Sequence, residues 1–336
     1  MKRYLVILLF LNAIFLGCTQ TVPEKIHGVS FVASPDTLKQ GNITPLQSVH
    51  ANFTAIMPFG FIRSLDHPEI IHDTERQWFG ETSKGARQYI QLLHTNGFKV
   101  MMKPQIWIWR GEFTGDLKMN SEAEWKALEI SYRNFILTYA NLAEEQKVAV
   151  FCIGTELEEF VMARPQFWNQ LIKEIRAIFK GKLTYAANWD EYKRVTFWEE
   201  LDFIGVDAYF PISDSLTPSI EEAKVGWKPW KEELKMVSSN FNKPILFTEY
   251  GYRSMDYAGK EPWDSNHLLP SINLQAQSNL LAGLYQEIWK EPWFAGGFLW
   301  KWFIAYERAG GNTDNQFTPQ NKPAEQIIKQ AYELNQ

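Results

Sequence analysis

The chain has 336 residues and a formal net charge of −5, and 15% of its residues are aromatic. The acidic balance argues against nucleic acid or another polyanion as the main partner. With only two cysteines, Cys18 and Cys152, the chain cannot rely on a disulfide framework and needs a large hydrophobic core. No Gly/Ser-rich or Pro-rich linker divides it, which favours a single domain.

The first 18 residues have the layout of a secretion signal. Lys2 and Arg3 precede an apolar run that is short for a membrane span. The small residue before Cys18 resembles a bacterial lipoprotein cleavage box, in which the cysteine is lipidated and begins the mature chain. An ordinary signal peptide or an uncleaved anchor is the alternative. We predict a lipoprotein signal over residues 1–17, a tether over 18–26 and a folded domain over 27–336. The domain would be exported and lipid-anchored to a bacterial membrane, at the cell surface or in the periplasm.

Along the rest of the chain, apolar runs alternate with segments of helical periodicity. The runs predict strands over residues 28–33, 53–59, 98–106, 148–155, 183–188, 202–210, 244–251 and 296–302. Helical spacing predicts helices over residues 82–95, from 121 to about 139, 168–175, 220–240, 274–291 and 323–333. The strands are continuous apolar runs, as expected of parallel strands covered on both faces. This pattern predicts an α/β fold, a single-domain (β/α)8 (TIM) barrel. A doubly wound open sheet is the alternative, but no glycine-rich phosphate loop supports it.

Polar and aromatic residues stand where these strands end. They are Lys103, Gln105, Trp107 and Trp109 in the third, Glu156 in the fourth, Asn188 and Trp189 in the fifth, Asp207 and Tyr209 in the sixth, Glu249 in the seventh, and Trp300 in the eighth. Because the carboxyl ends of barrel strands build the active site, we expect these groups to converge on one rim. A single acid could be explained by a structural ion pair, such as Glu156 with Lys103. Two acids ringed by aromatic residues fit that explanation poorly, because unpaired buried carboxylates are costly.

Glu156 and Glu249 end the fourth and seventh strands, which lie nearly opposite each other in a ring of eight. Two facing carboxyl groups are the equipment for cleaving a glycosidic bond. One must be protonated to assist the leaving oxygen, and the other must be ionised to attack the anomeric carbon. Proximity and partial burial can separate their pKa values in this way.

Several segments resemble glycoside hydrolase family 113. They are "GVSFVA" in the first strand, "IGTELE" in the fourth, "FTEYGY" in the seventh, "GGFLWKW" in the eighth and "FTPQNKPAE" near the end. The similarity runs from about His27 to the C-terminus. It implies a retaining β-1,4-mannanase acting on mannan or glucomannan, with no organic cofactor and no catalytic metal.

The resemblance implies a role for each matching residue. Glu156 would be the acid/base and Glu249 the nucleophile. Tyr209 would hydrogen-bond the nucleophile, and Trp300 would form the floor under the reacting sugar. The remaining residues expected to bind substrate are Lys103, Gln105, Asn188 and Trp189. Thr155 stands where much of the wider clan has Asn, so the contact to the sugar 2-hydroxyl must come from elsewhere.

Other functions remain open at this stage. The same site could serve an exo-β-mannosidase or a β-glucanase, since mannose and glucose differ at one hydroxyl. A non-catalytic glycan-binding lipoprotein is the alternative from another class. Trp107, Trp109 and Trp189 could be sugar platforms or could simply pack at the rim.

Overall fold

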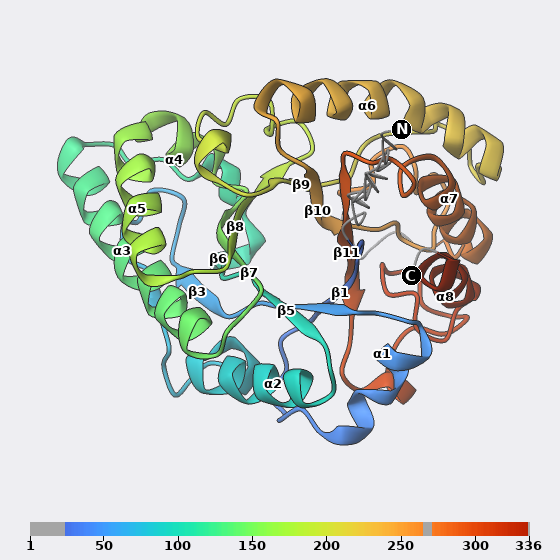
Figure 1. The fold of residues 1–336 in the computed structure, drawn as a ribbon, viewed down its shortest axis with the longest axis horizontal. Helices are drawn as coiled ribbons and strands as arrows, with labels where there is room; N and C mark the ends of the chain where they lie inside the picture. Colours follow the sequence, from blue (N-terminus) through green and yellow to red (C-terminus); the bar gives the residue numbers. More distant parts are fainter. Residues whose placement is uncertain (1–23, 265–270, 335–336) are drawn as a thin grey trace, which may run out of the picture.

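The computed structural model describes residues 24–264 and 271–334 of the chain. Eight parallel strands close into a barrel in the order β1-β11-β10-β9-β8-β7-β5-β2, surrounded by helices (Figure 1). This is the (β/α)8 barrel predicted from the sequence. The barrel strands are β1 (Ile26–Phe31), β2 (Phe53–Ile56), β5 (Lys99–Met102), β7 (Val150–Thr155), β8 (Lys182–Asn188), β9 (Ile204–Asp207), β10 (Ile245–Tyr250) and β11 (Phe294–Trp302).

The helices form the outer layer and follow most of the strands. They are α1 (Thr44–Ser48), α2 (Ser83–Thr95), α3 (Glu122–Glu145), α4 (Glu158–Ala163), α5 (Pro165–Ile178), α6 (Ile220–Phe241), α7 (Leu274–Glu287) and α8 (Pro323–Leu334). Between β8 and β9 the described chain makes only a short 3₁₀ turn, Trp198–Glu200. Side-chain caps fix several helix starts. Ser121 accepts a hydrogen bond from the Glu124 N–H at 3.2 Å, as the capping pattern there predicts.

Two of the predicted strands are wrong in extent, because each divides into two separate strands in the structure. The run over 53–59 divides into β2 and β3 (Phe59–Ile62), and the run over 98–106 divides into β5 and β6 (Gln105–Ile108). With β4 (Ile71–His72), β3 and β6 form a separate small sheet in the order β4-β3-β6. A proline, Pro58 or Pro104, stands at each break, where it cannot donate to a sheet ladder.

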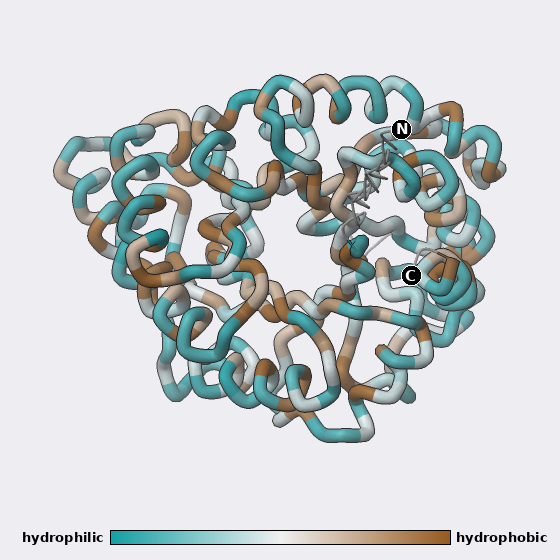
Figure 2. Tube along the Cα trace, in the orientation of Figure 1, coloured by the Kyte–Doolittle hydropathy of each residue, from teal (hydrophilic) through white to brown (hydrophobic). Residues whose placement is uncertain are grey.

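The hydrophobic core has two parts. A small cluster fills the inside of the barrel and contains Ile26, Phe53, Ala55, Met101, Val150, Leu246 and Phe298. A much larger cluster lies between the strands and the helices. Figure 2 shows hydrophobic residues among the strands and hydrophilic residues on much of the outer helical turns. Inward and outward faces of the strands are therefore both covered, which explains their continuous apolar sequence.

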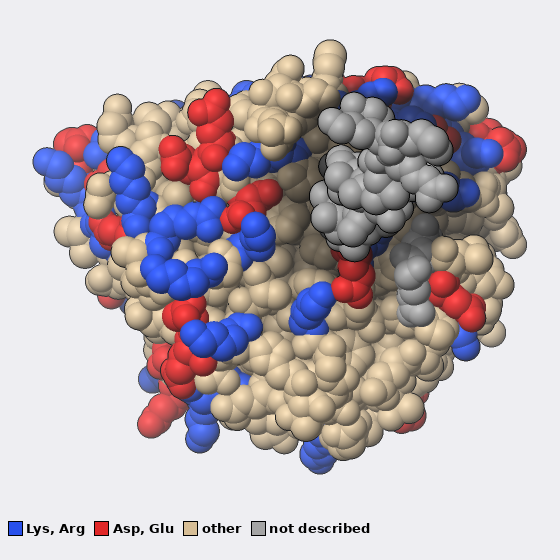
Figure 3. Space-filling view, in the orientation of Figure 1, with Lys and Arg blue, Asp and Glu red and all other residues tan. Residues whose placement is uncertain are grey.

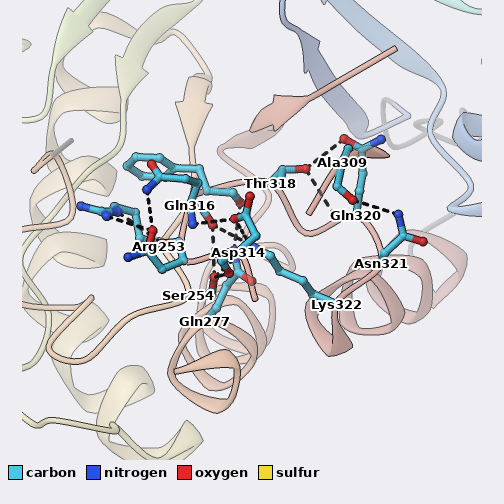
Figure 4. Close-up of polar contacts among 12 residues, drawn as sticks. Arg253, Ser254, Gln277, Ala309, Asp314, Gln316, Thr318, Gln320, Asn321 and Lys322 are labelled. Carbon is cyan, nitrogen blue, oxygen red and sulfur yellow. Dashed lines mark hydrogen bonds and ion pairs between the residues drawn. The ribbon is translucent and has the colours of Figure 1, made fainter. Parts of the chain in front are cut away.

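A buried polar network ties the segment after β11 to the segment after β10 (Figure 4). The Lys322 ammonium donates to the Ser254 hydroxyl (2.9 Å), the Asp314 carboxylate (2.8 Å) and the Gln316 carbonyl (2.7 Å). The Gln277 amide donates to the carbonyls of Tyr252 and Phe317 at 2.9 Å each. The network fixes Phe317, whose ring packs edge-on against Tyr209 at 5.9 Å between centroids. It thereby supports one wall of the barrel mouth.

The described chain begins at Glu24, so residues 1–23, including Cys18, lie outside it. Ile26, assigned to the tether from the sequence, is already the first residue of β1. None of the helices in the described ranges is long and apolar enough to cross a bilayer. On the face shown in Figure 3, basic and acidic side chains are interspersed, with an uncharged area over α1 and α2.

Candidate active site

The carboxylate of Glu249 lies at the centre of a polar cluster at the carboxyl ends of the strands. Glu249 belongs to β10 and is 7% exposed. One of its oxygens accepts hydrogen bonds from Lys103 Nζ (2.6 Å) and Gln105 Nε2 (3.0 Å), and the other accepts one from the Tyr209 hydroxyl (2.8 Å). The structure thus brings together residues at the carboxyl ends of β5, β9 and β10 with Gln105, the first residue of β6, and it contains the hydrogen bond expected of Tyr209.

Lys103 follows β5 and is fully buried between two carboxylates. Its ammonium also lies 3.1 Å from both carboxylate oxygens of Asp207, which accepts a further hydrogen bond from the Thr248 hydroxyl (2.7 Å). Burial alone would lower the pKa of Lys103, but the charges of Asp207 and Glu249 outweigh it and raise that pKa above its ordinary value. Burial, and then the charge of Glu249, raises the pKa of Asp207 to about 7.

These contacts revise the role expected of Lys103. The sequence predicts that Lys103 binds sugar hydroxyls, but its side chain has no exposed surface for a sugar to reach. Its ion pairs are with Asp207 and Glu249 rather than with Glu156. Lys103 therefore acts on the carboxylates that face the site.

Glu156 follows β7 in a backbone conformation that is unusual for a residue other than glycine, with a φ of 48°. Its N–H donates to the Ala186 carbonyl of β8 at 2.8 Å, and the next N–H, of Leu157, donates to the Tyr185 hydroxyl at 2.7 Å. Burial first, and then the charges of Asp207 and Glu249, raise the pKa of Glu156 well above its ordinary value, against the opposing charge of Lys103. The charge of Glu249 therefore acts directly on the ionisation of Glu156.

Tyr185 and Glu191 form a buried pair next to Glu156, and the sequence does not predict this pair. The Tyr185 hydroxyl donates to one Glu191 oxygen (2.7 Å), and the other oxygen accepts from the Asn188 N–H (2.9 Å). Burial is the main cause that raises the pKa of Glu191 to about 8. The stretch "NWDE" after the fifth predicted strand carried the signal, since it holds a second acid three residues beyond Asn188. These hydrogen bonds link the end of β8 to the turn that carries Glu156.

Close packing explains the glycine two residues before Glu156. A Cβ at Gly154 would lie 2.8 Å from the Tyr132 hydroxyl and 3.0 Å from the rings of Trp168 and Tyr185. Any larger residue would have to displace these buried aromatic side chains. Packing therefore requires the glycine at which the apolar run in "CIGTE" ends, and the candidate catalytic residue Glu156 follows it closely.

Asn188 and Trp189 lie at the end of β8, the strand next to Glu156. The Asn188 side-chain oxygen accepts the Trp189 N–H at 2.8 Å, and its NH₂ group has no hydrogen-bond partner among the described residues. The Trp189 ring stacks on Trp263 with centroids 5.0 Å apart and an interplanar angle of 15°. Asn188 can therefore still donate to a ligand, while Trp189 forms part of an aromatic wall.

Trp300, on β11, lines a cavity of about 310 Å³ at the barrel mouth. The other lining residues are Val32, Ala33, Met57, Phe59, Phe61, Trp78, Glu81 and Trp107. The cavity is mostly apolar and bordered by three tryptophans. Such a surface suits the apolar face of a sugar ring better than a charged ligand.

Cys152 lies inside β7 and is fully buried, and burial raises the pKa of its thiol to about 11. It behaves as a small hydrophobic residue, as the sequence indicates. Within residues 24–264 and 271–334, no three His, Cys, Asp or Glu side chains gather in a way that could hold a metal ion.

The comparisons with known proteins agree with this geometry. The family model of Glycoside Hydrolase Family 113 matches residues 36–322. The β-mannanase AaManA from Alicyclobacillus acidocaldarius superimposes with a TM-score of 0.80 and 23% identity, over 93% of this chain and 98% of that one. A second family 113 β-1,4-mannanase gives 0.79 and 21%, over 92% and 99%. A β-glucuronidase from Faecalibacterium prausnitzii gives 0.62 and 15%, over 93% of this chain and 49% of that one.

No curated protein matches the sequence significantly. The family model nevertheless spans most of the described barrel, including every strand end that contributes to the Glu249 cluster. The chain belongs to glycoside hydrolase family 113 and is a glycoside hydrolase with a (β/α)8 barrel.

Proposed function

We propose that this glycoside hydrolase is a retaining endo-β-1,4-mannanase that cleaves mannan or glucomannan by double displacement. The contrast between the two glutamates carries the proposal. Three donors point at Glu249, an arrangement that stabilises a carboxylate, whereas the surroundings of Glu156 favour its protonated form. The similarity to structures described as β-1,4-mannanases supports the choice of substrate.

The reaction follows from these roles. A Glu249 oxygen attacks the anomeric carbon while Glu156 gives its proton to the glycosidic oxygen, so the leaving chain departs as an alcohol. A covalent glycosyl ester on Glu249 results. Glu156, now ionised, then takes a proton from a water molecule whose oxygen attacks the anomeric carbon and releases Glu249. Two inversions leave the anomeric configuration unchanged.

The other residues would orient the nucleophile or bind the sugar. Tyr209 and Gln105 hold the Glu249 carboxylate, and Lys103 keeps a positive charge beside it. Trp300 would form the floor of the site. The unpaired NH₂ group of Asn188, on the strand next to Glu156, could supply the sugar-hydroxyl contact that Thr155 cannot make.

Two substitutions test the assignment. Glu156→Gln removes general acid assistance and should lower kcat on manno-oligosaccharides by about 10²–10⁴-fold. Glu249→Ala removes the nucleophile and should abolish turnover, and both variants should still bind mannohexaose. Glu159→Gln serves as the control, since Glu159 lies in the first turn of α4 and pairs with Lys118 on the exposed surface (3.5 Å).

The alternatives give different results in the same assays. Wild-type protein that binds mannohexaose but never cleaves it would be a glycan-binding protein. Mannohexaose shortened strictly one sugar at a time would make the enzyme an exo-β-mannosidase, and faster cleavage of β-glucan oligosaccharides would make it a β-glucanase. Proton NMR of the first product anomer would distinguish retention from inversion.

Export and anchoring through Cys18 are a separate proposal, supported by the N-terminal pattern alone. Wild-type protein should partition with membranes and incorporate labelled fatty acid in a bacterial host. Cys18→Ser should do neither. Labelling of the Ser variant would contradict the proposed site.

A further inference from the structure

Three tryptophans line a groove beside the active site and remain widely exposed. Trp78, Trp107 and Trp109 expose 52%, 50% and 68% of their surface. Trp107 lies in β6, Trp109 begins the 3₁₀ turn after it, and Trp78 precedes α2. They line a cavity of about 770 Å³ together with Phe61, Ile62, Arg63, Ile71, Thr74, Arg76, Gln77 and Glu81. The groove is therefore built on the small β4-β3-β6 sheet.

This groove is continuous with the cavity over Trp300. Trp78, Trp107, Phe61 and Glu81 line both cavities. A ligand that rests on Trp300 can therefore extend over Trp107 and Trp78 towards Trp109 without leaving an aromatic surface. The small β4-β3-β6 sheet, which is separate from the eight barrel strands, provides this additional surface.

The exposure of these rings is not explained by packing. Large indole side chains contribute most to stability when buried, and an exposed cluster of them usually marks a binding surface. Arg63 and Arg76 line the same cavity and have no ion-pair partner among the described residues, so they can donate hydrogen bonds to a ligand. Flat aromatic faces with donors at the edge fit a chain of pyranose rings, which offer an apolar face and peripheral hydroxyls.

The position of the acid/base determines which end of the sugar chain lies in the groove. The leaving group must lie beside Glu156, which follows β7 and borders β8. Glu156 lines neither cavity, whereas Trp300 of β11 and the chain after β1 and β2 line the inner one. The groove therefore extends from the side of the reacting sugar that faces away from the leaving group, which is the non-reducing side.

We propose that the Trp78–Trp107–Trp109 groove binds further sugar residues on the non-reducing side of the cleaved bond. This rests on the proposed function and makes the groove the reason for endo action. A sugar chain must then occupy the groove beyond the reacting residue, so cleavage occurs inside the polymer and not at its non-reducing terminus.

The test compares Trp109→Ala and Trp78→Ala with wild type on reducing-end-labelled mannohexaose and on an aryl β-mannoside. Losing one stacking platform should lower kcat/KM for mannohexaose by about threefold to tenfold. The loss should be clearly smaller for the aryl mannoside, which cannot reach the groove. The labelled products should lengthen, because binding no longer favours several sugars on the non-reducing side. Trp109→Phe should recover part of the loss.

Met236→Ala is the control, since Met236 is an exposed apolar residue on α6 (61% exposed) away from the groove. Thermal melting checks that each variant is folded. Equal losses on both substrates, or shorter labelled products, would overturn the groove assignment while leaving the proposed function intact. If wild type cleaves no manno-oligosaccharide at all, the proposed function fails first. In that case calorimetric titration of Trp109→Ala and wild type with mannohexaose tests the groove alone, and equal affinities would overturn it.

Discussion

Glu156 and Glu249 are chemically identical side chains in two different surroundings. Glu249 accepts three hydrogen bonds, whereas the Glu156 carboxyl group has no hydrogen-bond or ion-pair partner among the described side chains. Asp207 influences both. It holds Lys103 beside Glu249, and its negative charge raises the pKa of Glu156. At the scale of single residues, the division of labour thus depends on a third acid that does not react.

Replacing Asp207 with Asn should therefore change the pH profile. Without the Asp207 charge the pKa of Glu156 falls, so Glu156 loses its proton at a lower pH. Because a general acid is active only when protonated, the alkaline limb of kcat/KM should move to lower pH. The difference should be largest above pH 7, where Asp207 itself is ionised in the wild type.

A pH–rate profile on mannohexaose measures this shift. Asp190→Asn is the matched control, because Asp190 is an exposed acid near the end of β8. An alkaline limb that stays in place or moves to higher pH would contradict the role given to Asp207.

At the scale of elements, β7 and β8 position the acid/base through one tyrosine. The Tyr185 hydroxyl joins the Leu157 N–H to the Glu191 carboxyl group, so the turn carrying Glu156 is fixed by the neighbouring strand. The left-handed conformation of Glu156 costs on the order of 1–2 kcal/mol. Contacts of this kind, together with the Glu156–Ala186 hydrogen bond, hold the residue in that conformation.

Tyr185→Phe should lower both stability and turnover. It leaves two buried polar groups without their shared partner, which costs roughly 1–3 kcal/mol of unfolding free energy. It also loosens the Glu156 turn, so kcat should fall more than KM changes. Urea denaturation and steady-state kinetics measure the two effects.

Tyr285→Phe provides the comparison. Its hydroxyl lies 2.9 Å from that of Tyr250 in a buried cluster that includes Tyr332, away from Glu156. It should lose comparable stability and keep its kcat. A Tyr185→Phe variant that behaves like Tyr285→Phe would reduce Tyr185 to a structural residue.

The elements also show what could be predicted from the sequence. All eight barrel strands were found, because parallel strands covered on both faces are long apolar runs. The small sheet was missed because only Met57-Pro58 and Lys103-Pro104 separate its strands from β2 and β5. The two prolines were a usable signal, and the Gln105 N–H donates to the Pro58 carbonyl at 2.9 Å across the two breaks.

The same comparison applies to the site. Residues at strand ends, such as Glu156, Glu249 and Tyr209, could be placed from topology alone. Glu191 and Trp78 could not, because they lie in connecting segments whose path is set by tertiary packing. The burial of Lys103 was also hidden, since the sequence shows a strand end but not what covers it.

For the whole molecule, the amino-terminal end of the ring holds a buried histidine. His27, in β1, is 1% exposed, its ring stacks on Tyr332 at 4.7 Å, and neither ring nitrogen has a hydrogen-bond partner among the described residues. Burial lowers the pKa of His27 to about 4. The folded state therefore binds a proton at the His27 ring more weakly than the unfolded chain does.

Acid should thus destabilise the barrel through His27. The stability gained by keeping His27 neutral in the folded state is fully present above the unfolded pKa of 6.5. It is lost as the pH falls from there towards 4. A shift of this size is worth about 2–3 kcal/mol by pH 4. His27→Phe should remove it, so that urea unfolding at pH 7 and pH 4 differs less than in the wild type.

His50→Asn, at a partly exposed histidine with positive φ, should keep the wild-type difference. Parallel pH dependence in wild type and His27→Phe would show that protonation of His27 does not oppose folding.

The hydrogen bonds between β1 and β11 join strands that lie more than 260 residues apart in the chain, Ile26 opposite Gly296. During synthesis, every other strand is made before the ring can be completed. A polypeptide that stops short of residue 294 therefore carries two open β-edges, on β1 and β10, each able to pair with another copy. Nonsense variants or proteolytic fragments ending before β11 should accumulate as aggregates, not as partly active enzyme.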